Sequence, residues 1–159
     1  MLIYRYFNSL DGLIAAYIQQ NDYWINFNEE LPDKEHLSEF IKQIFKRQIV
    51  RLRESYTLKR LYRWELSTDN KFVKELRDKR EEKGLWLIEA VSRLSKHPQK
   101  ETAAVASIIT AAISYLALLE ENCQAYNGLK IQQETGWEQL EEGINLLVDL
   151  WLQKTTLTK

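Results

Sequence analysis

The chain has 159 residues, of which 45% are hydrophobic and 28% are charged, and its formal net charge is −1. These proportions are ordinary for one globular domain and exclude a polycation, so any contact with nucleic acid must be a local patch. The single cysteine, Cys123, excludes an internal disulfide and indicates a reducing compartment, which we expect to be the cytoplasm.

Apolar residues recur with a period of about 3.6 along most of the chain, which predicts an all-α fold. Only five glycines and two prolines are present, in agreement with about seven long helical pieces. Residues 2–7 are apolar, aromatic and basic, and we expect them to be the end of one helix. Ser9 is expected to cap the next helix, because its hydroxyl can accept from the free amides of the first turn.

Two helices are expected in the next part of the chain. The first follows a turn at residues 31–33 and carries a clear apolar stripe that ends at Leu52. Residues 54–57 are expected to separate it from a shorter helix that ends near Leu66.

The second half of the chain is expected to hold three long helices. The first is expected to be capped by residues 67–69 and to continue through the charged stretch 77–83, with a break near Gly84 as the alternative. The next begins at Pro98 and is expected to run to about Gln124, after which Gly128 can adopt a left-handed conformation. The last has the Thr-x-x-Glu spacing of a capping box at residues 135–138.

Residues 103–119 read AAVASIITAAISYLALL and contain no charge. A helix that is apolar all round must be buried all round, so three environments compete: a membrane, the domain's own core, or a core on one side and a second copy on the other. A membrane span needs about 20 apolar residues, and this shorter run includes serines and a threonine. We therefore expect no membrane contact and favour the third environment.

The last helix supports this choice, because it carries Leu146 and Leu150 beside its main apolar stripe. The sequence thus predicts a helical bundle whose last two long helices form a four-helix interface in a homodimer. The predicted interface residues are small on the first helix and large on the second: Ala104, Ser107, Ala111, Ser114, Ala117, Leu146 and Leu150.

Basic residues are concentrated between positions 42 and 63, where the only acid is Glu54. They are Lys42, Lys46, Arg47, Arg51, Arg53, Lys59, Arg60 and Arg63. Such a run can form a surface that attracts phosphate or simply the solvated face of a helix, and we favour the second interpretation.

No catalytic motif is found in the sequence. There is no nucleophile elbow, no phosphate-binding glycine loop and no paired-histidine zinc motif. His36 and His97 are far apart, and the single cysteine cannot complete a metal site. We therefore predict a binding protein rather than an enzyme, with no metal and no cofactor.

Residues 2–18, LIYRYFNSLDGLIAAYI, resemble the end of the DNA-binding region of TetR-like transcriptional regulators. In that family a recognition helix ends in a Tyr-x-Tyr/His-Phe motif, and a short turn leads into a helix that connects the DNA-binding head to the regulatory domain. Here residues 4–7 match the motif, and Asn8 and Ser9 match the turn. Leu10 departs from the family pattern, which commonly has a lysine there.

The resemblance implies two parts: residues 1–8 as the remnant of a recognition helix, and residues 9–159 as a ligand-binding and dimerisation domain. Two further helices of the head would be expected before Met1. Tyr4, Arg5 and Tyr6 would approach operator DNA, and a small-molecule effector would bind among the middle helices. The aromatic candidates for that pocket are Tyr17, Trp24, Phe40, Phe45, Tyr62, Trp86 and Tyr115.

A second hypothesis stays open. The chain is then an all-α dimerisation or ligand-binding module that has no DNA-binding activity in this form.

Overall fold

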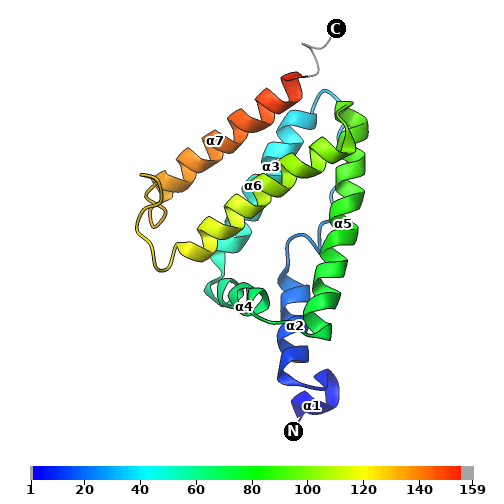
Figure 1. Cartoon of the computed structure of the whole chain (residues 1–159), viewed down its shortest axis with the longest axis vertical. Helices are drawn as coiled ribbons and strands as arrows, with labels where there is room; N and C mark the ends of the chain where they lie inside the picture. The colour runs from blue at the N-terminus through cyan, green and yellow to red at the C-terminus, as the bar shows by residue number, and fades with distance from the viewer. Residues whose placement is uncertain (1, 155–159) are drawn as a thin grey trace. The chain divides into compact units, whose positions relative to one another are not determined.

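The computed structural model describes the backbone of residues 2–154 and the side chains of residues 4–154. Met1 and residues 155–159, which the expected domain ranges include, lie outside it. The described chain is all-α, with seven helices and no strands (Figure 1), which confirms the predicted fold class. The helices are α1 (Leu2–Phe7), α2 (Leu10–Asn21), α3 (Leu37–Glu54), α4 (Tyr56–Leu66), α5 (Lys71–Ser95), α6 (Gln99–Leu119) and α7 (Glu134–Gln153).

The helices belong to two compact units. Unit 1 comprises the chain up to Glu29 together with Ser55–Leu87, and unit 2 comprises Glu30–Glu54 together with the chain from Ile88 onward. Helix α5 is continuous, so its first part belongs to unit 1 and its last part to unit 2. The charged stretch 77–83 does not interrupt it, which confirms the prediction of one long helix over a break near Gly84.

In unit 1, a tight turn joins α1 to α2. Asn8 adopts a left-handed conformation (φ 63°), and the Ser9 hydroxyl accepts from the backbone N–H of Gly12 at 3.0 Å, as predicted. Gly12 is required here, because a Cβ at this position would lie 2.0 Å from the carbonyl oxygen of Phe7. The absent side chain therefore lets the end of α1 lie directly against the first turn of α2.

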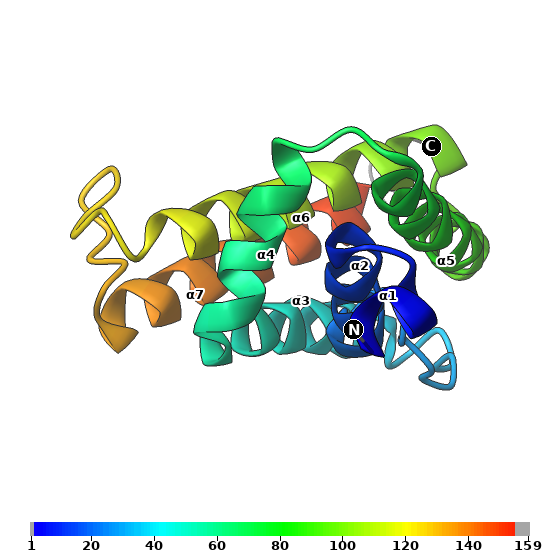
Figure 2. The same ribbon diagram turned by 90° about the horizontal axis from the view of Figure 1, so that it is seen from below.

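The core of unit 1 forms where α4 packs against α2 (Figure 2) and α5 adds apolar side chains. Ala15 and Ile18 of α2 and Leu76 of α5 are buried in it. Partly buried apolar residues surround them, among them Leu61 of α4 and Phe72 of α5.

Helix α5 is capped by Asn70, so the predicted cap at residues 67–69 is wrong. The Asn70 side-chain oxygen accepts from the backbone N–H groups of Phe72 and Val73, both at 3.0 Å. The hydroxyls of Ser67 and Thr68 instead donate to the carbonyl of Trp64, at 3.0 and 2.7 Å. Both hydroxyls therefore close the end of α4 and are not free to cap α5.

In unit 2, α3 packs against both α6 and α7 (Figure 1). The apolar stripe predicted for residues 37–52 is the buried side of α3. The core residues of unit 2 on these three helices include Leu37, Ile41, Ile44, Phe45, Ile49, Leu52, Ile109, Ile113, Leu116, Trp137, Ile144 and Val148.

Ion pairs connect α3 to α7 along their length. They are Lys42–Asp149 at 2.8 Å, Lys46–Glu141 at 2.7 Å and Arg53–Glu134 at 2.8 Å. Numbers rise along α3 as they fall along α7, so the two helices are antiparallel. Hydrogen bonds from Lys42 and Ser38 lower the pKa of Asp149. Three members of the basic run are therefore paired with acids of α7, which is neither of the two interpretations that the sequence offered.

The loop between α6 and α7 begins earlier than expected, because α6 ends at Leu119 rather than near Gln124. Tyr126 and Leu129 exchange two backbone hydrogen bonds of 2.9 Å, and the two residues between them have positive φ. This is the two-residue turn of a β-hairpin without flanking strands. The left-handed conformation expected for Gly128 is confirmed by its φ of 84°.

Helix α7 begins against this loop. The indole N–H of Trp137 donates to the carbonyl of Ile131 at 2.7 Å, and a Cβ on Gly136 would lie 2.4 Å from the carbonyl oxygen of Lys130. The helix starts at Glu134, and its N-cap residue, Gln133, makes no side-chain cap. The predicted capping box at residues 135–138 is therefore wrong, because the turn that precedes α7 places Thr135 inside the helix.

We predict that Gly136→Ala lowers the free energy of unfolding by about 1–3 kcal/mol, because the added methyl group meets backbone that cannot move away cheaply. Gly84→Ala is the matched control. It adds the same group in a helix where nothing lies within 4 Å, and it should stabilise by about 0.5–1 kcal/mol. Urea titrations of both variants measure the two changes, and equal effects would contradict the close approach at Gly136.

Candidate functional site

Three features of the described chain are candidates for function. The first is the exposed surface of α1. Tyr4 and Tyr6 expose 67% and 69% of their surface, and Arg5 is also exposed. The three predicted DNA-binding residues therefore lie together on one short helix, open to solvent.

The second feature is a pair of exposed apolar stripes on α6 and α7, which we call the outer stripes. Each lies on the side of its helix turned away from the buried residues. On α6 the outer stripe consists of Ala104, Ser107, Ile108, Ala111, Ala112 and Tyr115, and on α7 it consists of Gly143, Leu146, Leu147 and Leu150. The three leucines are more than half exposed, and Ile108 exposes 67% of its surface.

Five of the seven predicted interface residues belong to the outer stripes: Ala104, Ser107, Ala111, Leu146 and Leu150. Ser114 is half-buried, and its hydroxyl accepts from the Gln48 amide at 3.5 Å. Ala117 is fully buried and faces the core of unit 2 rather than the solvent. The sequence did not single out Ile108 and Leu147 for this face, because a helix that is apolar all round does not show which side its own chain covers.

Helix α6 has 21 residues and is long and apolar enough to cross a membrane, and only 28% of its most apolar window is buried. The prediction against a span relied on the shorter run of residues 103–119. Ile109, Ile113 and Leu116 are nevertheless buried in unit 2. One side of α6 therefore belongs to a packed core and the other side is uncovered.

The predicted pocket residues are divided between the units, so neither unit by itself gathers all seven. Tyr17, Trp24, Tyr62 and Trp86 belong to unit 1, and Phe40, Phe45 and Tyr115 belong to unit 2. Phe45 is buried in the core, whereas Trp86 and Tyr115 are about half exposed. Within unit 1, Trp24 and Trp86 both contact Phe27, with ring centroids 6.3 and 6.5 Å apart.

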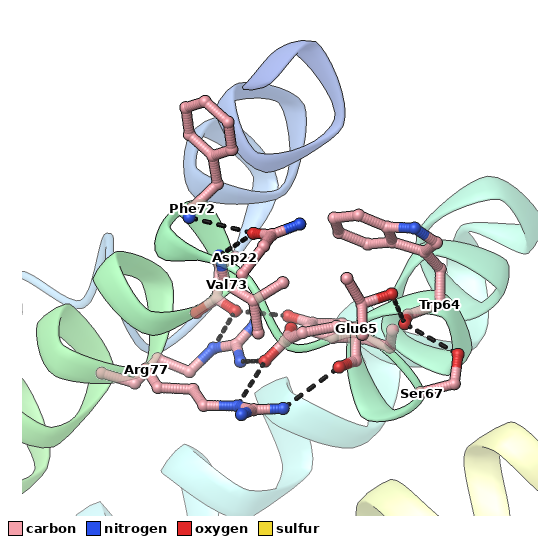
Figure 3. A network of polar contacts seen from close by, with 11 residues as sticks. Asp22, Trp64, Glu65, Ser67, Phe72, Val73 and Arg77 are labelled. Carbon is pink, nitrogen blue, oxygen red and sulfur yellow. Dashed lines mark hydrogen bonds and ion pairs between the residues drawn. The ribbon is translucent and has the colours of Figure 1, made fainter. Parts of the chain in front are cut away.

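The third feature is a buried polar network in unit 1 that joins α2, α4 and α5 (Figure 3). Its centre is Asp22, the residue that follows α2, which is only 1% exposed. One carboxylate oxygen of Asp22 accepts from the Tyr62 hydroxyl at 2.5 Å and from Arg80 Nε at 2.7 Å. The other accepts from the backbone N–H of Ile25 at 2.9 Å. Both oxygens of this carboxylate are therefore satisfied.

Arg80 connects Asp22 to a second buried acid, Glu65 of α4. Arg80 Nη1 lies 2.5 Å from Glu65 Oε1, and the guanidinium covers the Tyr62 ring at 4.9 Å. Burial disfavours the charge on Arg80, yet its hydrogen bond to Glu65 and the charge of Asp22 raise its pKa. Burial and the neighbouring Asp22 also raise the pKa of Tyr62. Arg80 therefore stays charged and Tyr62 stays neutral at physiological pH.

Three buried polar atoms near this network have no hydrogen-bond partner: Glu65 Oε2, Arg80 Nη2 and Trp24 Nε1. Arg77 does not satisfy the Glu65 side chain, because its Nη2 donates to the Glu65 backbone carbonyl at 3.1 Å and its Nε is 3.9 Å from Oε1. Such groups are uncommon in native interiors and are often explained by a bound molecule or water.

Asp22, Glu65 and Arg80 were not identified from the sequence. The available signal was weak: Asp22 ends a helix, where the dipole disfavours an acid, so it requires a compensating cation. Nothing in the spacing shows that this cation is 58 residues away.

Among the residues that the structure describes, no group of three or more histidine, cysteine, aspartate or glutamate side chains is arranged to hold a metal ion. Comparison with protein-family models, with curated proteins and with solved structures finds no match for this chain.

We predict that Arg80→Met lowers the free energy of unfolding by about 3–5 kcal/mol, because it leaves two buried carboxylates without their cation. The matched control is Lys46→Met, which removes a cation whose partner, Glu141, is reached by water. The control should change stability little. Chemical denaturation of both variants measures the difference, and similar losses would show that the network is not the stronger constraint.

Proposed function

We propose that this chain is the dimerising and effector-binding part of a TetR-like transcriptional repressor in the cytoplasm. The single observation that carries the proposal is the pair of outer stripes on α6 and α7. The helix–turn–helix order of α1 and α2 is in agreement with it.

The outer stripes support a homodimer. Soluble monomers rarely expose large continuous apolar patches, and a second copy would present the same two stripes around a two-fold axis. The stripe on α6 has small residues at Ala104, Ser107 and Ala111, and the stripe on α7 has leucines. Large side chains of one copy can therefore lie over small ones of the other, in an interface that buries about 2,000 Å² or more. Ala117 is not part of this interface, because its own chain already covers it.

The exposed residues of α1 support contact with DNA. In a regulator with a complete head, two recognition helices would enter successive major grooves about 34–36 Å apart. Helix α1 lies directly against the start of α2, and the other end of α2 is held by Arg80 and Tyr62 through Asp22. A molecule that alters packing among α2, α4 and α5 would therefore shift the populations of two positions of α1.

We predict that the chain forms a dimer of twice its 18.9 kDa and that Leu150→Glu makes it monomeric, because a charge would be buried in the interface. Val50→Glu is the matched control, since Val50 is an exposed aliphatic residue of α3 in the same unit. Light scattering should show a dimer for the wild type and for the control. An unchanged dimer of Leu150→Glu would place the interface elsewhere, and a wild-type chain that is monomeric or binds lipid vesicles would contradict the proposal.

We also predict that a form extended by the upstream coding sequence binds DNA from the gene's own promoter, with an affinity that falls as salt rises. Substitution of Tyr4 and Arg5 by alanine should weaken that complex without changing the dimer. A mobility-shift assay on both forms tests this. If the extended form dimerises but does not bind DNA at low salt, the chain is a dimerisation module and not a repressor.

A further inference from the structure

We infer that Glu65 Oε2 and Arg80 Nη2 receive a neutral group of the effector that both donates and accepts a hydrogen bond, such as a hydroxyl or a carboxamide. This inference rests on the effector-binding role proposed above and names the chemical class of the effector.

The bonding of the network leaves these two atoms over. Asp22 accepts three hydrogen bonds, and the Nε and Nη1 groups of Arg80 are both used. On Glu65, Oε1 is paired with Arg80 and Oε2 is not. The network therefore lacks one donor for a carboxylate oxygen and one acceptor for a guanidinium N–H, on two side chains that already contact each other.

The charges select a neutral partner. An ammonium group would satisfy Glu65 but would bring a second cation next to Arg80, and a carboxylate would satisfy Arg80 but would face Glu65. A hydroxyl or carboxamide can donate to Oε2 and accept from Nη2 at once, without adding a charge to a buried site.

An aromatic body on the same molecule agrees with the neighbouring residues. Trp24 follows Asp22 by two residues, its indole N–H is buried without a partner, and it contacts Phe27, which in turn contacts Trp86. We therefore describe the effector as a small aromatic or amphipathic alcohol or amide. Because Glu65 belongs to α4 and Arg80 to α5, such a molecule would add a bond between these two helices.

Three probes that share one ring test the inference: benzyl alcohol, benzylammonium and benzoate. At about ten times its dissociation constant, benzyl alcohol should raise the thermal unfolding midpoint of the full chain by about 3–5 °C, because it binds the folded state only. The two charged probes should not raise it. This comparison uses the wild-type chain, so it does not depend on the folding of any variant.

Two variants locate the effect. Glu65→Gln should abolish the shift caused by benzyl alcohol, and Arg80→Lys should reduce it. Glu120→Gln is the matched control, since Glu120 is a largely buried acid paired with Arg53 in unit 2, and it should keep the full shift.

Any of four results would overturn the inference: no shift with benzyl alcohol, equal shifts with all three probes, an undiminished shift in Glu65→Gln, or a crystal structure grown with benzyl alcohol in which an internal water alone fills both positions. None of these measurements involves dimerisation or DNA. Their failure would therefore leave the proposed regulator intact, and a monomeric wild-type chain would leave this site untested by neither probe nor variant.

Discussion

The uncovered side of α6 is the constraint on which the architecture of unit 2 depends. A helix without charges over residues 103–119 loses free energy wherever it meets water, and α3 covers only the side that carries Ile109, Ile113 and Leu116. Helix α7 repeats the situation with three exposed leucines beside its own buried stripe. Both helices thus have two apolar sides and only one core, which is why we look for a second copy.

Unit 1 is organised by a different force. A buried guanidinium there joins two acids from separate helices, and the burial of those charges is acceptable only because each is paired. Apolar contacts between α2, α4 and α5 can slide, whereas these pairs need fixed geometry. The network therefore defines where α2 ends, and it does so at the point farthest along the helix from α1.

Local and periodic features could be predicted from the sequence. The seven helices follow from the spacing of apolar residues, and the Ser9 cap and the left-handed Gly128 follow from chemistry within a few residues. The cap of α5 could not be chosen in this way, because Ser67, Thr68 and Asn70 compete for two helix ends that are close together in sequence. Pairs such as Asp22–Arg80 leave no periodic trace, and a uniformly apolar helix does not show which of its alanines is inside.

The missing side chain at Gly12 has a mechanical consequence for α1. Because the carbonyl of Phe7 occupies the space that a Cβ would need, the two helices meet backbone to backbone, with no flexible side chain between them to absorb movement. The joint is further closed by the Ser9 cap and the left-handed Asn8. Helices α1 and α2 therefore form a rigid elbow, in which rotation of the long arm swings the short arm by the same angle.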